Sequence, residues 1–139
     1  MTAAEGAVPS KPKPEPTELS RGFWEAAGQG SLTAQYCAGC QRYQHYPRPL
    51  CLECWGSELE WRALAGTGTL YTFSIVHRAP SKEFGGAPYA VGLVDLDEGV
   101  RMMGAITAPS LDDLNVGARV RVRFEDRDGA SVPYFEVDR

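Results

Sequence analysis

The chain contains no long hydrophobic run, and this absence excludes one large class of proteins. No apolar stretch among its 139 residues approaches the ~18–20 residues of a membrane-spanning helix. The first residues, MTAAEGAVPSKPKPEPTELS, also lack the apolar core of a secretory signal. We therefore expect a cytoplasmic protein with no membrane partner, in a compartment where thiols stay reduced.

Positive charge is in short supply as well. The chain has 14 Lys and Arg against 18 Asp and Glu, which gives a formal net charge of −4. Affinity for nucleic acids comes largely from cationic contacts to phosphate. The acidic balance therefore predicts that the protein has no nucleic-acid partner.

Groups suited to catalysis are few. The chain has two histidines, and His77 follows a strand-like segment, where a histidine is more typical of structural hydrogen bonding than of a base. Gly66-Thr67-Gly68 opens a strand and is not followed by a helix, so it does not match a phosphate-binding loop. Nucleophilic catalysis needs a nucleophile, a base and a third group that orients the base. We find no such set, and we predict no catalytic residues and no enzyme activity for this chain by itself.

The chain does have four cysteines, all in the short stretch YCAGCQRYQHYPRPLCLEC. They form two Cys-x-x-Cys pairs, Cys37 with Cys40 and Cys51 with Cys54. Two such turns place four thiolates in a tetrahedron, which is the closed geometry of structural zinc. An iron–sulfur cluster and a pair of disulfides are the alternatives. His45 lies between the pairs, but four cysteines already saturate the site, so we do not expect it to bind the metal.

The residues before the cysteines divide into a tail and a helix. Residues 1–17 contain four prolines, which predicts a disordered, extended tail or linker. Residues 18–34 are predicted to form a short helix, since Leu19, Phe23 and Ala27 recur every four positions and glycines follow. This apolar face either packs against the rest of the chain or awaits a partner surface.

The remainder is predicted to be mainly β. Residues 35–62 form the metal ribbon and residues 63–139 the barrel, and from Gly66 the hydrophobic period becomes two. In the first strand Leu70, Thr72, Ser74 and Val76 alternate with Tyr71, Phe73, Ile75 and His77. In the fourth, Val116, Ala118, Val120, Val122 and Phe124 face away from Arg119, Arg121 and Arg123. Five short strands predict a small closed barrel, with strands at 68–77, 88–96, 100–106, 116–124 and 132–137.

In this order the motifs resemble those of a family of zinc-ribbon and OB-fold proteins, which is known as domain of unknown function thirty-five (DUF35). Its members accompany thiolases and thiolase-like aldolases in acyl-CoA metabolism. The resemblance covers residues 18–139. Besides the cysteine pairs it depends on Pro47-Arg48, Trp61, the stretch from Gly66 to Phe73, Pro88-Tyr89, the turn from Val94 to Gly99, and Gly117.

The resemblance implies a helix, a rubredoxin-like zinc ribbon and a five-stranded OB-fold barrel. It also implies a non-catalytic subunit that docks on a thiolase-fold enzyme, a thiolase or a retro-aldolase, and helps to hold an acyl-CoA. Steroid side-chain degradation is one setting for such complexes. Some relatives are joined to hydratase-type subunits, which makes such a subunit a second expected partner.

Two groups of residues are candidates for these contacts. Aromatic and arginine side chains are enriched at interface cores. The helix and the ribbon, together with the loop from Arg78 to Pro88, are therefore expected to form the docking surface. Its candidate residues are Phe23, Trp24, Arg42, Tyr43 and Tyr46. The candidates for CoA phosphates are the cations Arg48, Arg78 and Lys82.

A single-stranded nucleic-acid-binding barrel is the alternative function. Such barrels use aromatic side chains and a cationic groove, and Tyr71, Phe73 and the three arginines of the fourth strand imitate this pattern. Residues 63–139 contain eight Lys and Arg but eleven Asp and Glu. The arginine row is therefore expected to face solvent or a protein partner.

Overall fold

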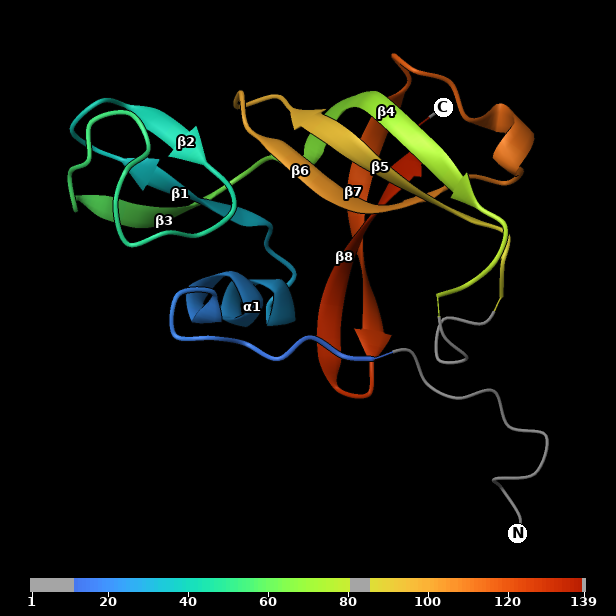
Figure 1. Cartoon of the computed structure of the whole chain (residues 1–139), viewed down its shortest axis with the longest axis horizontal. Coiled ribbons are helices and arrows are strands. Elements are labelled where there is room, and N and C mark those ends of the chain that lie inside the picture. Colours follow the sequence, from blue (N-terminus) through green and yellow to red (C-terminus); the bar gives the residue numbers. More distant parts are fainter. Residues whose placement is uncertain (1–11, 81–85, 139) are drawn as a thin grey trace, which may run out of the picture.

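An α-helix, a three-stranded sheet and a closed five-stranded barrel follow one another along the chain (Figure 1). The computed structural model describes residues 12–80 and 86–138. Most of the predicted tail at 1–17 and the candidate Lys82 therefore lie outside the described residues. No helix in the described part of the chain is both long and apolar enough to cross a membrane.

The helix α1 spans Arg21–Gly28 and is shorter than the predicted segment. Phe23 and Ala27 are buried, so this face packs against the rest of the chain, but Leu19 lies before the helix and is 46% exposed. The amides of Gly30 and Ser31 bond back to the carbonyls of Ala27 and Ala26, which ends the helix. Gly30 has a φ of +80°, a conformation that glycine adopts without strain.

The ribbon is a small antiparallel sheet in the order β2-β1-β3. Its strands are β1 (Thr33–Cys37), β2 (Arg42–Gln44) and β3 (Leu59–Ala63). The helix α1 packs close to this sheet, because a Cβ atom at Gly22 would overlap the indole ring of Trp61 on β3. The helix also contacts β8 of the barrel, so it joins the two β-structures (Figure 1).

The barrel confirms the predicted number of strands and closes in the order β4-β5-β6-β8-β7. The strands are β4 (Thr67–Val76), β5 (Tyr89–Leu96), β6 (Arg101–Thr107), β7 (Arg119–Arg127) and β8 (Ala130–Val137), with a 3₁₀ turn at Leu111–Asp113 before β7. The parallel pairing of β6 with β8 and the antiparallel pairing of β4 with β7 close the sheet. Leu70, Val94, Val120 and Phe135 are fully buried inside it.

Two details of the predicted strands are wrong. The pairing of β4 with β5 shifts register between Leu70 and Thr72, so the inward face changes there. Leu70 and Phe73 both pack into the core, although strict alternation places them on opposite faces. Val116 is not in a strand and is 67% exposed, because Gly117 turns the chain with a φ of +92° before β7 begins.

Candidate metal centre and neighbouring surfaces

The four cysteines meet at one point of the ribbon. Their sulfur atoms all lie within 4.8 Å of one another. The Sγ atoms of Cys37 and Cys54 are 3.6 Å apart, and those of Cys40 and Cys51 are 3.4 Å apart. A disulfide requires ~2.05 Å, whereas zinc with ~2.3 Å bonds to four sulfurs in a tetrahedron separates them by about 3.8 Å. The spacing excludes disulfides in this structure and fits a structural zinc site.

The two cysteine turns have the same backbone geometry. The amide of Gln41 donates to the carbonyl of Cys37 at 2.8 Å, and the amide of Trp55 donates to that of Cys51 at 2.9 Å. Gln41 and Trp55 both adopt a positive φ, of 58° and 63°. Non-glycine residues rarely adopt this conformation. Each turn therefore folds back on itself after its second cysteine and aims both sulfurs at the metal position.

The local environment moves the pKa values of Cys51 and Cys40 in opposite directions. Hydrogen bonds from the backbone of Cys54 and of Glu53 lower the pKa of Cys51 to about 6. Its neighbour Cys40 has a pKa raised to about 12, chiefly by its hydrogen bond to Cys51. Clustered thiolates repel one another unless a cation neutralises them. A divalent metal supplies that charge, and its binding energy becomes folding energy for the ribbon.

A buried pair of glutamines holds the loop between the two cysteine turns. The side-chain oxygen of Gln35 accepts hydrogen bonds from Gln44 Nε2 at 2.8 Å and from the amide of Arg48 at 2.8 Å. Its nitrogen donates to the carbonyl of Arg48 at 2.9 Å. Gln44 in turn bonds the carbonyl of Leu50 and the amide of Leu52. The loop is therefore fixed at three points, and the sequence analysis did not identify either glutamine.

This fixed loop exposes several large apolar side chains. Trp55 is 77% exposed and Tyr46 is 54% exposed. Leu50 and Leu52 are also exposed and line a shallow hollow with Trp55, whereas Tyr46 does not line that hollow. We call Tyr46, Leu50, Leu52 and Trp55 the ribbon surface. Sequence analysis identified only Tyr46, although a tryptophan directly after a metal-binding cysteine is visible in the sequence.

The other predicted interface residues occupy different environments. Phe23 is only 6% exposed and belongs to the core, where it packs edge-on against Trp24 at 4.9 Å. Trp24 is half-buried, and Tyr43 is half-buried against Tyr36. Arg42 is exposed and pairs with Glu53 at 3.6 Å. Phe23 is therefore a core residue. The exposed residues of this predicted set are Arg42 and Tyr46.

The structure does not bring the candidate CoA cations together. Arg48 lies on the ribbon loop, where its guanidinium donates to the carbonyl of Tyr46 at 3.1 Å. Arg78 follows β4 and is exposed. The end of β4 lies on the side of the barrel away from the ribbon (Figure 1). These two cations therefore cannot contact the same phosphate within one chain.

The arginine row of β7 is occupied by ion pairs with carboxylates. Arg119 pairs with Asp97, Arg121 with Asp138, and Arg123 with Glu125 and Glu136. Tyr71 lies under the guanidinium of Arg101 at 3.6 Å, and Phe73 packs against the core. Neither the cations nor the aromatic rings form the open stacking platform that single-stranded nucleic acids require.

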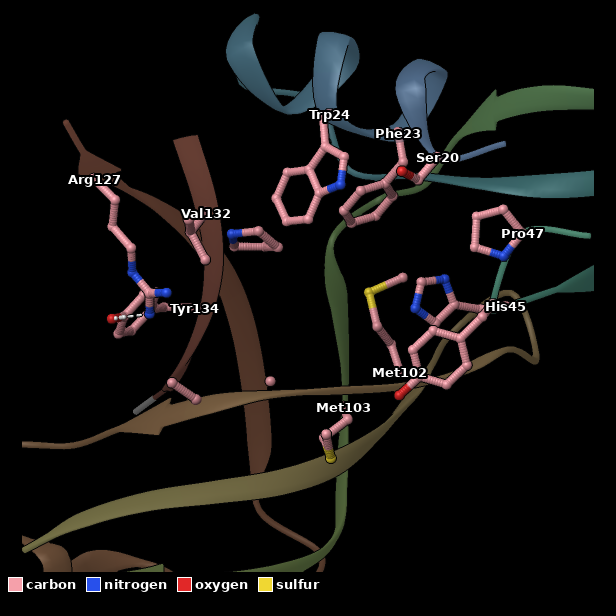
Figure 2. Close-up of a pocket in the computed structure, with 14 residues that line it drawn as sticks. Ser20, Phe23, Trp24, His45, Pro47, Met102, Met103, Arg127, Val132 and Tyr134 are labelled. Carbon is pink, nitrogen blue, oxygen red and sulfur yellow. Dashed lines mark hydrogen bonds between the residues drawn. The ribbon is translucent and has the colours of Figure 1, made fainter. Parts of the chain in front are cut away.

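A pocket of about 260 Å³ lies where the helix, the ribbon loop and the barrel meet. Figure 2 shows Arg127 and Tyr134 on one side of it and His45 and Pro47 on the other. The rest of the wall comes from α1, β6 and β8, including Trp24, Met102, Met103 and Val132. Elements far apart in the sequence build this pocket, so no local motif predicts it.

His45 belongs to this pocket and not to the metal cluster. The centre of its ring lies 4.4 Å from that of Tyr46 and 5.7 Å from that of Phe23. Burial, with a smaller effect from Arg48, lowers the pKa of His45 to about 4. The imidazole is therefore neutral near pH 7. His77 is exposed at the end of β4.

Comparison with family models identifies both β-structures. Residues 24–60 match the model described as "ChsH2, rubredoxin-like zinc ribbon domain". Residues 61–125 match the model described as "ChsH2, C-terminal OB-fold domain". The two matches are contiguous and follow the order of the ribbon and the barrel.

Curated relatives have two kinds of description. A "DUF35 domain-containing scaffold protein" of Methanocaldococcus jannaschii is 33% identical over 103 residues, which cover 70% of this chain and 73% of that protein. A "Probable enoyl-CoA hydratase alpha subunit" of Thermomonospora curvata is 33% identical over 86% of this chain. The match covers only 38% of the length of the latter protein.

Solved structures give the same result. The chain superposes on one chain of an "Ltp2-ChsH2(DUF35) aldolase" with a TM-score of 0.82 and 30% identity, covering 90% of this chain and 98% of the other. A protein of unknown function from Sulfolobus solfataricus matches with a TM-score of 0.62 at 14% identity, which supports the fold alone.

Proposed function

The chain belongs to the DUF35 family of zinc-ribbon and OB-fold proteins, and on this basis we propose that it is a non-catalytic subunit of an acyl-CoA enzyme. The partner we propose is a thiolase-fold enzyme that acts as a thiolase or a retro-aldolase. The observation that carries the proposal is the likeness, along nearly the whole of both chains, to the DUF35 chain of an aldolase.

The chemistry of the described residues supports a non-catalytic role. A zinc ion held by four sulfurs has no open position for water or substrate. His45 is half-buried and is neutral near pH 7, and its ring packs against aromatic side chains instead of a nucleophile. The function of the chain therefore depends on what it binds.

The ribbon surface is the proposed docking site for the partner enzyme. Tyr46 and Leu50 lie on the loop that the two buried glutamines hold, and Leu52 and Trp55 lie in and after the second cysteine turn. Such a surface loses little conformational entropy when it binds, which favours association. Trp55 is its most exposed member and is the residue type most often found at the energetic centre of an interface.

Acyl-CoA is the proposed ligand of the assembled complex. Arg48 lies beside the ribbon surface, where it is a candidate for a CoA phosphate once the partner is bound. Arg78 would have to act elsewhere, because the two arginines are on different sides of the molecule (Figure 1). A hydratase-type subunit is a second proposed partner, supported by relatives described as hydratase alpha subunits.

Two tryptophans provide a matched test of the docking site. Trp55→Ala should weaken association with a purified thiolase-fold partner about tenfold or more, while the melting temperature changes little, since Trp55 is exposed. Trp24→Ala should mainly lower the melting temperature, because Trp24 packs on Phe23. Affinities from surface plasmon resonance and melting curves separate the two effects. Unchanged affinity for the Trp55 variant would remove the ribbon surface from the interface.

A further inference from the structure

The pocket between helix, ribbon and barrel has walls that are almost entirely apolar. Phe23 and Trp24 come from α1, Met102 and Met103 from β6, and Val132 from β8 (Figure 2). At about 260 Å³ it is slightly smaller than the ~300–1,000 Å³ typical of drug-sized ligands. It therefore suits a small ligand that is mostly hydrocarbon.

One cation lies at the wall of this pocket. Arg127, at the end of β7, donates from Nη2 to the hydroxyl of Tyr134 at 2.9 Å and from Nη1 to the carbonyl of Pro12 at 3.2 Å. Its Nε is buried and has no hydrogen-bond partner within the described residues. This nitrogen has almost no accessible surface, so a ligand in the pocket does not reach it. Nη1 and Nη2 each carry a second N–H beyond the hydrogen bond given above, and these are the donors for a ligand.

Arg127 also differs from the other arginines of β6 and β7. Each of those has a carboxylate partner: Arg101, Arg119, Arg121 and Arg123. Among residues 12–80 and 86–138, no carboxylate lies within ion-pair distance of Arg127. The side chain of its neighbour Asp126 accepts a hydrogen bond from the amide of Gly129 instead. The pocket thus has a guanidinium whose bonds all go to neutral groups.

None of the described residues that line the opposite wall is charged, although Arg48 lies close enough to His45 to contribute to its lowered pKa. His45 is neutral near pH 7 because burial lowers its pKa to about 4. Figure 2 places His45 and Arg127 on opposite sides of the pocket. Arg127 is therefore the charged side chain among the described residues that line the pocket, and the body of the pocket is hydrophobic.

From this arrangement we propose that the pocket binds a small hydrophobic carboxylate. The carboxylate bonds the remaining N–H groups of Arg127 Nη1 and Nη2, and the hydrocarbon chain or ring extends between Met102, Trp24 and His45. Charge-assisted hydrogen bonds from arginine to a carboxylate are among the strongest that proteins form. Burial of the hydrocarbon in the apolar part of the pocket contributes the remaining affinity.

The methionines allow a direct measurement. The chain has three, and two of them, Met102 and Met103, line the pocket. In the zinc-loaded full-length protein labelled with ¹³C-methyl methionine, hexanoate should shift those two signals. Affinity should rise from butanoate to hexanoate by up to about fourfold per methylene. Hexanamide, which has the same shape without the charge, should bind at least about tenfold more weakly.

Matched substitutions locate the charge. Arg127→Gln should weaken hexanoate binding about tenfold or more and leave hexanamide binding nearly unchanged. Arg121→Gln removes the same charge from the same strand, but Arg121 pairs with Asp138 and does not line the pocket. It should change hexanoate affinity less than about twofold. Equal binding of acid and amide, equal effects of the two substitutions, or no methionine shift at millimolar hexanoate would each overturn the proposal. The acid and amide comparison requires no variant, so it decides the question even if Arg127→Gln does not fold.

Discussion

Replacing Gln35 with methionine should destabilise the ribbon strongly, although the new side chain has about the same volume as the old one. The substitution keeps a side chain of similar length but removes one acceptor and two donors. Three hydrogen bonds are lost: two to the backbone of Arg48 and one to Gln44. Gln44 Nε2 keeps its bond to the carbonyl of Leu50, so it is not left without a partner.

The magnitude follows from the groups that lose their partners. The amide and the carbonyl of Arg48 are both left unpaired, and each unsatisfied buried group costs about 1–3 kcal/mol. Arg48 is half-buried, so water recovers part of this loss. We expect the free energy of unfolding to fall by about 2–4 kcal/mol, which corresponds to a melting temperature lower by roughly 6–15 °C for a chain of this size.

Denaturation of the zinc-loaded protein by guanidinium, followed by tryptophan fluorescence, measures this change. Gln29→Met is the matched control, since Gln29 is exposed directly after α1 and its side chain makes no hydrogen bond among the described residues. The control should change stability by less than about 0.5 kcal/mol. If the two variants were equally stable, the glutamine pair would not hold the ribbon loop, and the reasoning for a fixed ribbon surface would fail.

Three further predictions concern the metal and the ionisable groups. Cys40→Ser should unfold the ribbon, because the free energy of metal binding contributes to folding. Elemental analysis of the variant should find less than one zinc ion per chain. A metal-free protein with a folded ribbon would contradict this. Asp97 has a pKa lowered from 3.8 to about 2, chiefly by Arg119, so the stability it contributes is present above pH ~4 and is lost between pH ~4 and ~2. Asp97→Asn should remove this loss of stability at low pH, measured as the melting temperature against pH. An unchanged dependence of the melting temperature on pH would refute the assignment to Asp97. The pKa of His45 is lowered from 6.5 to about 4, so stability should decline as the pH falls through this range. His45→Gln should flatten the decline, and an unchanged decline would contradict this.

The local parts of the fold could be predicted from the sequence because their signals are local. Two Cys-x-x-Cys pairs specify a metal site within eighteen residues, and the turn at Gly99 between β5 and β6 lies where its residue types indicate. The bulge in β4 was not predictable in the same way. It places Leu70 and Phe73 on one face because of how β4 pairs with β5, which depends on residues far along the chain.

The pocket and the glutamine pair could not be predicted for the same reason. Gln35 and Gln44 are opposite each other only because β1 and β2 pair in that register. A glutamine on a strand usually indicates an exposed position, so its burial carries no sequence signal. Arg127 and His45 line one pocket although they are far apart in the sequence. Contacts of this kind require the assembled fold.

The central claim is that this chain works as a subunit of a thiolase-fold enzyme. The most direct measurement is quantitative mass spectrometry of the native complex, isolated through the tagged full-length chain and separated by size. The account predicts a thiolase-fold enzyme in a fixed ratio with this chain, and loss of that enzyme from the complex with Trp55→Ala. A chain that elutes as a monomer with no thiolase-fold protein, and that leaves the activity of such an enzyme unchanged when added to it, would contradict the account.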